Sequence, residues 1–153
     1  MNAFQLLKED HKKVSGIFDQ IEPTTERAEK TRTELFAQLH QELDIHAKIE
    51  EAIFYPAIKQ AAETRKIVLE GFEEHHVIKT LLKELEGMPV DTEQWAAKCK
   101  VLQENVEHHV EEEEGEMFQK ARQVLSEDEI NQLGTRMEEL KTQLKQQSKS
   151  AGA

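Results

Sequence analysis

Residues 43–56 read LDIHAKIEEAIFYP, and residues 106–118 read VEHHVEEEEGEMF. Each stretch contains a histidine followed four residues later by a glutamate, a spacing that places both side chains on one helix face. The neighbouring positions on that face are apolar, so each pair is expected in the core. The pairs are His46 with Glu50 and His109 with Glu113. Because a buried carboxylate is costly without a partner, they indicate a metal cluster inside a helical bundle.

Working outward, apolar residues recur every three or four positions along most of the chain, which predicts an all-α protein. Scarce Gly and Pro and a charged fraction of 33% agree with this class. Short connections favour antiparallel neighbours, so we expect an up-down-up-down four-helix bundle with an additional C-terminal helix. The fifth helix either packs along the bundle or forms a dimer contact. The predicted helices span about 2–22, 63–86, 92–124 and 127–146, and the second helix runs from about 25–30 to Tyr55 or a turn beyond.

Local signals set these boundaries. Pro23 breaks the first helix, Pro56 ends or kinks the second, and Gly87 stops the third. Ser126 with Glu129 forms a capping box that starts the fifth helix. We therefore predict one domain over 1–146 and a flexible tail over 147–153.

The chain also repeats itself. Glu9–Lys12 aligns with Glu73–His76 at an offset of 64 residues, and the two His-x-x-x-Glu pairs align at an offset of 63. Each half is then a helical hairpin that brings one histidine from its first helix and a histidine with a glutamate from its second. Two hairpins packed face to face predict a pseudo-twofold site in the bundle core.

The predicted site offers imidazole nitrogens as terminal ligands and carboxylates that can each bridge two metals. An added oxo or hydroxo bridge would leave an open position on each octahedral metal. Mixed nitrogen and oxygen donors suit iron, with manganese or zinc as weaker alternatives. The metal-ligand candidates are His11, His46, Glu50, His75, His109 and Glu113.

Other residues can be interpreted as either structural or functional. Tyr55 is placed to line an approach path, and the single cysteine, Cys99, is expected to be a buried, inert core thiol. A further set lies off the apolar stripes. Each of its members is either a surface residue, a residue that orients a metal ligand, or itself a ligand. That set comprises His40, His76, His108, Glu51 and Glu114.

A net charge of -11 argues against binding to nucleic acid or to an anionic membrane surface. The N-terminus lacks a basic, then apolar, leader pattern, and no apolar run approaches the roughly 20 residues that span a bilayer. We therefore expect a cytoplasmic protein.

These motifs resemble those of the hemerythrin-like, HHE cation-binding family over nearly all of residues 4–124. The resemblance rests on Glu9–His11, His46 to Pro56, Glu74–His75 and His108 to Phe118. It implies the antiparallel four-helix bundle and a non-haem di-iron centre. It also implies that Glu50 and Glu113 bridge the irons while the four inward histidines are terminal ligands.

The chain departs from the oxygen-carrying members of that family. The carriers have five histidine ligands, with His-x-x-x-His in the third helix, whereas Lys79 stands four residues after His75 here. The carriers also place an aspartate five residues after the last histidine, whereas Glu113 comes four residues after His109. The ligand set is closer to bacterial HHE proteins and to the di-iron domain of iron–sulfur repair proteins.

The expected function is a dinuclear iron site that binds dioxygen, nitric oxide or peroxide for sensing, storage or detoxification. One alternative is a di-iron enzyme acting on peroxide or nitric oxide, or in iron–sulfur repair. Another is a structural or iron-buffering bundle without turnover.

Overall fold

The computed structural model describes residues 1–151 and confirms the all-α class and the helical bundle. Two short π-helical turns, η1 (Glu50–Phe54) and η2 (Glu113–Met117), interrupt the regular helices. The α-helices are α1 (Ala3–Ile21), α2 (Glu29–Ile49), α3 (Tyr55–Lys59), α4 (Ala62–Glu86), α5 (Glu93–Glu112), α6 (Phe118–Val124) and α7 (Glu127–Ala151).

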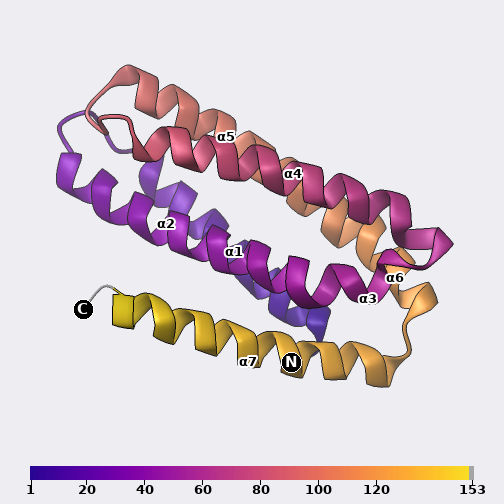
Figure 1. Ribbon diagram of the computed structural model, residues 1–153. Coiled ribbons are helices and arrows are strands. Elements are labelled where there is room, and N and C mark those ends of the chain that lie inside the picture. The colour runs from indigo at the N-terminus through magenta and orange to yellow at the C-terminus, as the bar shows by residue number, and fades with distance from the viewer. Residues whose placement is uncertain (152–153) are drawn as a thin grey trace.

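The bundle consists of two helical hairpins. Figure 1 shows α1 beside α2 in one hairpin and α4 beside α5 in the other, with the chain reversing direction between successive long helices. The α3 and α6 segments continue α2 and α5 beyond the π-helical turns. The structure thus has the antiparallel arrangement that the short connections predict.

The fifth long helix packs along the bundle. In Figure 1, α7 runs beside α1 and α2, on the side away from α4 and α5. Its apolar stripe, Ile130, Leu133 and Met137, is buried in these contacts. A Cβ at Gly134 would overlap the backbone of Met1 and Asn2, so glycine permits this close approach.

Two apolar clusters fill the bundle on either side of a polar layer. One contains Phe4, Phe54 and Phe118, and the other contains Leu39 and Trp95. Along α1 and α2, the inward histidines lie at the junction of the two clusters. Apolar packing therefore holds the backbone rigidly above and below the polar side chains.

Both π-helical turns begin at a glutamate of the His-x-x-x-Glu pairs. The Tyr55 amide donates to the Glu50 carbonyl, and the Phe118 amide donates to the Glu113 carbonyl, each spanning five residues rather than four. Such a turn inserts one residue and rotates the downstream part of the helix, and π-helical turns concentrate at functional sites. The same irregularity at equivalent places in both hairpins continues the sequence repeat into the backbone.

Several helix ends differ from the predicted ones. The second segment continues through η1 and α3 to Lys59, a turn beyond Tyr55 and within the predicted range, because proline fits the first turn of α3. The predicted 92–124 helix is divided by η2. The helix that was expected to end at 146 continues to Ala151, so most of the predicted 147–153 tail is helical; residues 152–153 lie outside the described part.

The helix α7 starts at its predicted capping signal. The Ser126 amide donates to Glu129 Oε1 at 3.0 Å and the Glu129 amide donates to Ser126 Oγ at 3.2 Å, which is the predicted capping box.

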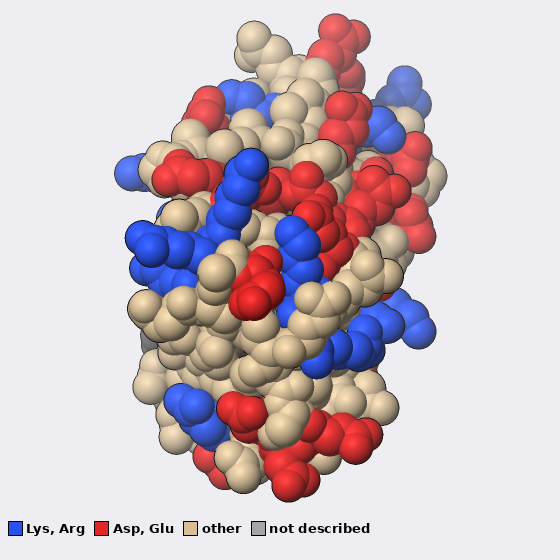
Figure 2. Space-filling view, turned by 90° about the vertical axis from the view of Figure 1, so that its right-hand side faces the viewer, with Lys and Arg blue, Asp and Glu red and all other residues tan. Residues whose placement is uncertain are grey.

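Among residues 1–151, no helix has the length and apolar character needed to cross a membrane. Figure 2, a view onto the α3 and α6 end, shows acidic side chains gathered in its upper part and again at the bottom, with most of the basic ones between.

Candidate metal centre

All six predicted metal-ligand candidates meet in the polar layer of the bundle. They are buried, with Glu50 and Glu113 completely inaccessible to solvent. They form two clusters, in each of which one donor atom per residue lies within 4.8 Å of the others. The first cluster is His11, His46 and Glu113, and the second is Glu50, His75 and His109.

The Nε2 atoms of the histidines face the glutamates. Glu50 Oε1 lies 3.1 Å from His46 Nε2 and 3.0 Å from His75 Nε2. Glu113 Oε1 lies 3.0 Å from His11 Nε2, and Glu113 Oε2 lies 3.3 Å from His109 Nε2. Each carboxylate therefore reaches histidines of both clusters, Glu113 through both of its oxygens and Glu50 through Oε1.

Several of these close atoms lack hydrogen-bond partners, which provides a test of whether a metal fits. Within the described chain, His11 Nε2, His46 Nε2, Glu50 Oε2 and Glu113 Oε1 are fully buried without a hydrogen bond. Unsatisfied buried polar atoms are costly and uncommon in proteins. Four such atoms aimed at one place, all of metal-ligating types, fit a pair of cations held between them.

A second layer of carboxylates fixes the histidine rings. His46 Nδ1 is 2.9 Å from Asp10 Oδ2, and His109 Nδ1 is 2.6 Å from Glu74 Oε1. The other two rings are held in the same way, His75 by Glu51 at 2.8 Å and His11 by Glu114 at 2.6 Å. A carboxylate on Nδ1 leaves Nε2 free for a metal and raises its basicity, as second-layer partners do in metal sites.

This second layer obeys the sequence repeat, since Asp10 and Glu74 are equivalent and so are Glu51 and Glu114. The halves differ in what surrounds the carboxylates. Asp10 is 3% exposed and also forms an ion pair with Lys141 of α7. No helix of the described chain covers the α4–α5 side in the same way, and Glu74 there is half-buried. The fifth long helix, α7, therefore contacts the candidate metal centre through Asp10, which is one of the four outer carboxylates of that centre.

Tyr55 belongs to the centre rather than to an approach path. Its hydroxyl lies 3.1 Å from Glu113 Oε2, 3.3 Å from His75 Nε2 and 3.4 Å from His109 Nε2. The π-helical turn places Tyr55 on the same face as Glu50, and a Cβ at Gly71 would lie 2.8 Å from the hydroxyl, so glycine makes room for it. The equivalent residue in the other hairpin is Phe118, so a single hydroxyl breaks the pseudo-twofold symmetry.

Burial and paired charges act against each other on the titratable groups. Burial lowers the pKa of His46, but the charges of Glu50 and Glu113 and the hydrogen bond to Asp10 prevail and raise that pKa to about 10. Burial likewise opposes the ionised form of Glu50, yet His46 and other neighbours hold the pKa of Glu50 well below its usual value. For Tyr55, burial and the charges of Glu50 and Glu113 all raise the pKa, so the hydroxyl keeps its proton.

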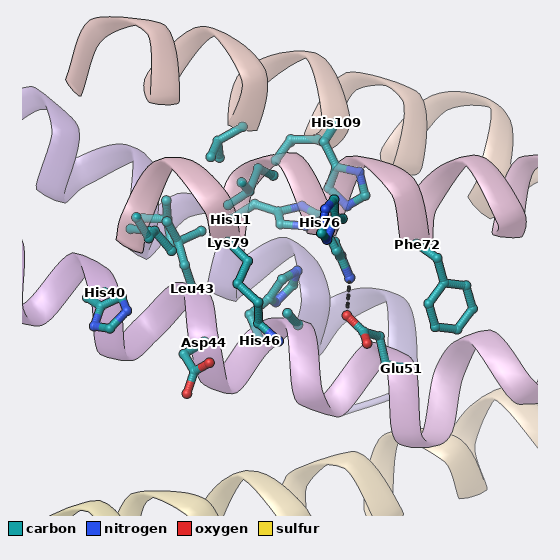
Figure 3. A pocket seen from close by; sticks show the side chains of 17 residues that line it. His11, His40, Leu43, Asp44, His46, Glu51, Phe72, His76, Lys79 and His109 are labelled. Carbon is teal, nitrogen blue, oxygen red and sulfur yellow. Dashed lines mark hydrogen bonds and ion pairs between the residues drawn. The ribbon is translucent and has the colours of Figure 1, made fainter. Parts of the chain in front are cut away.

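A cavity of about 230 Å³ leads from the surface to the imidazoles. Figure 3 shows it between α2 and α4, with His11, His46 and His109 at its inner end. Its outer part is bordered by His40 and Asp44 of α2 and by the exposed His76 and Lys79 of α4. The cavity gives the candidate metal centre a route to solvent that the apolar clusters do not block.

The remaining candidates lie outside the two buried clusters. His40 stacks on Phe36, with ring centroids 5.9 Å apart, and His76 is exposed at the cavity border. His108 is exposed, and its Nε2 lies 3.1 Å from Glu112 Oε1. Cys99 is buried as predicted, and burial raises the pKa of its thiol to about 11, so it is an inert core residue.

A protein family model matches most of this chain. The model of the hemerythrin HHE cation binding domain matches residues 2–121. A protein of Mycobacterium tuberculosis, named uncharacterized protein Rv2633c, is 30% identical over 142 residues, which cover 90% of this chain and 83% of the relative.

A crystal structure with the same fold comes from Mycobacterium kansasii, where the protein is described as a hemerythrin HHE cation binding domain-containing homolog of Rv2633c. It superposes with a TM-score of 0.83 at 28% identity and covers 94% of this chain and 87% of that one. A DNA nickase of Nostoc sp. is 25% identical over 149 residues. This chain spans only 41% of the length of that nickase, although the match covers 95% of this chain.

Proposed function

Because this chain belongs to the hemerythrin HHE cation-binding domain family, we propose that its two buried clusters hold a pair of iron ions that bind dioxygen, nitric oxide or peroxide. The observation that carries the proposal is the set of unpaired buried nitrogen and oxygen atoms that converge between Glu50 and Glu113. Manganese and zinc are the alternatives that the same donors accept.

The protein's part is to hold the metals in fixed places. His11 and His46 would serve one ion and His75 and His109 the other, with Glu50 and Glu113 reaching both. The outer carboxylates keep each ring oriented, so Nε2 rather than Nδ1 faces inward. Buried, pre-oriented donors need no rearrangement when a metal arrives.

A bound iron pair would supply electrons to a small ligand, which is chemistry that protein side chains lack. The protein controls the surroundings in which this occurs. Tyr55 holds a proton at Oη, within reach of Glu113 and of two imidazoles, on one side of the centre only. The hydroxyl can donate a hydrogen bond to a charged oxygen nearby, as it does to Glu113, while the buried Phe54 and Phe118 exclude water from this part of the core.

The nickase similarity does not lead us to propose action on DNA. The phosphate backbone attracts basic surfaces, whereas this chain carries a net charge of -11. Its share of the nickase length is below half, so the activity can reside in the remainder of that protein. We accordingly propose a small-molecule ligand and no nucleic acid.

Anaerobic optical titration tests the proposal. The metal-loaded, reduced protein would be mixed with dioxygen, nitric oxide or hydrogen peroxide in turn while absorbance and ligand consumption are followed. Binding predicts a spectral change that saturates at a fixed ratio of ligand to protein and reverses when the ligand is removed.

The alternatives give different results in the same experiment. Continued consumption of peroxide or nitric oxide beyond that ratio would show an enzyme rather than a binding protein. A reduced, iron-loaded protein that changes its spectrum with none of the three ligands would contradict the proposal and favour a structural or iron-buffering bundle.

A further inference from the structure

The cavity beside the metal centre is larger than a two-atom ligand needs and is apolar along most of its depth. Val14, Ile78, Leu82 and Val106 line it and come from three different helices. All four are buried. Only the inner end, where the histidine Nε2 atoms converge, and the outer border carry polar groups.

The volume sets the size of an occupant. An apolar protein cavity of about 150 Å³ accommodates one benzene molecule, which has six heavy atoms. By proportion, the cavity of about 230 Å³ accommodates roughly nine heavy atoms. Dioxygen, nitric oxide and hydrogen peroxide each have two heavy atoms and would leave most of this apolar space without contacts.

We propose that the site also takes an organic ligand: a short aliphatic chain of about six carbons with a carboxylate head. The head would lie at the metals and the chain would fill the cavity between α2 and α4. This inference rests on the proposed metal centre, because the cations provide the positive charge that the head requires.

The arrangement of charge at the cavity supports this orientation. The inner end has four imidazoles whose Nε2 atoms face the candidate metals, so an oxygen anion finds its partner there. Figure 3 shows Asp44 of α2 and Glu51 of η1 at the outer part of the cavity, opposite His76 and Lys79 of α4. The acidic and basic side chains at that border offset one another, so the border does not hold an anionic head, whereas cations at the inner end would hold it.

A series of unbranched carboxylates measures the predicted fit. Acetate, butanoate, hexanoate and decanoate would be titrated into the metal-loaded protein by calorimetry at constant pH and salt. Burial of one methylene contributes about 0.8 kcal/mol, which corresponds to a roughly fourfold gain in affinity. We expect about this gain for each methylene up to hexanoate and no further gain for decanoate, which exceeds the cavity.

Two adjacent substitutions separate the cavity from the rest of the helix. Ile78→Phe adds volume to the lining and should abolish the preference for hexanoate over acetate. Val77→Phe makes a similar change on the exposed face of α4, where Val77 is 44% accessible, and should leave the preference intact. Leu82→Ala enlarges the cavity and should move the best chain length beyond hexanoate. Metal content and circular dichroism establish that each variant is folded and loaded.

The outcomes distinguish this inference from the proposed function. Equal affinity for acetate and hexanoate in metal-loaded protein would overturn the organic ligand and leave the metal centre standing. Identical behaviour of Ile78→Phe and Val77→Phe would overturn it as well. A protein that takes up no metal would overturn the proposed function, and this inference with it.

Discussion

Asp10→Asn tests whether the outer carboxylates set the metal affinity of the centre. Asp10 is 3% exposed, and Oδ2 accepts a hydrogen bond from His46 Nδ1 at 2.9 Å. Asparagine keeps a side-chain oxygen that can accept this bond but removes the negative charge. His46 Nε2 then becomes a weaker donor to a metal while its position is preserved.

The size of the expected loss can be taken from similar second-layer changes. Removing such a partner typically weakens metal binding about 10-fold to 100-fold, which corresponds to about 1.4 to 2.7 kcal/mol. Asp10 should lie towards the upper end, because it is more buried than Glu51, whose side chain is 37% exposed and accessible to water. Glu51→Gln should therefore cost less than Asp10→Asn.

Competition with a chelator of known affinity measures the dissociation constants. Glu42→Gln is the matched control, because Glu42 Oε1 lies 2.8 Å from Lys13 Nζ and 3.7 Å from Lys145 Nζ rather than against an imidazole. Asp10→Asn also removes the ion pair with Lys141, so thermal unfolding of the metal-free proteins establishes the purely structural cost. If Asp10→Asn binds metal as tightly as Glu42→Gln, the outer carboxylates do not act as we argue.

Three further predictions concern the centre itself. Glu50→Ala and Glu113→Ala should each lower the metal content and the Tm of the loaded protein, because metal binding stabilises the folded state by mass action; unchanged metal stoichiometry in both would exclude the bridging role. Tyr55→Phe removes the hydrogen bond to Glu113 and should lower the free energy of unfolding by about 1 kcal/mol without loss of metal. Denaturant unfolding measures this free energy, and an unchanged midpoint would show that the hydrogen bond contributes nothing to stability. In the metal-free protein the pKa of His46 is raised from 6.5 to about 10. The protonated imidazole therefore stabilises the folded state fully below pH 6.5, and this contribution is lost as the pH rises through about 10. Metal must displace that proton, so metal affinity should rise with pH across this interval; calorimetry in buffers of different ionisation enthalpy should detect proton release, and its absence would show that His46 is not a ligand.

The fold class was predictable from the sequence because its signals are local and repeated. Apolar residues recur with helical spacing, and the connections after Ile21 and Glu86 are too short for parallel neighbours. The inward histidines were found because each occupies a position on an otherwise apolar stripe. The structure brings these residues together, while their role as metal ligands remains a prediction for metal analysis and the variants to test.

The π-helical turns could not be read from the sequence. Ile53, Phe54 and Tyr55 are all apolar or aromatic, so the pattern after Glu50 suits either an α-helical or a π-helical turn. Without the inserted residue, Tyr55 is displaced from the Glu50 face and its hydroxyl points away from the centre. The space for that hydroxyl depends on Gly71, which is sixteen residues further along and on another helix.

The sequence contains part of the pattern that identifies the outer carboxylates. Asp10 and Glu74 each directly precede an inward histidine, and the offset of 64 residues aligns them. Each, however, orients the histidine of the neighbouring helix rather than the adjacent one, a pairing that only the packing of the hairpins determines. Lys141 lies 131 residues from Asp10, and nothing local to α7 identified it as a partner.

Metal analysis of anaerobically purified protein tests the central claim most directly. We predict about two iron ions per chain, one for each buried cluster, and a near-ultraviolet absorption that changes when air is admitted. Folded protein that contains no metal and takes up none on incubation with ferrous iron would contradict the claim.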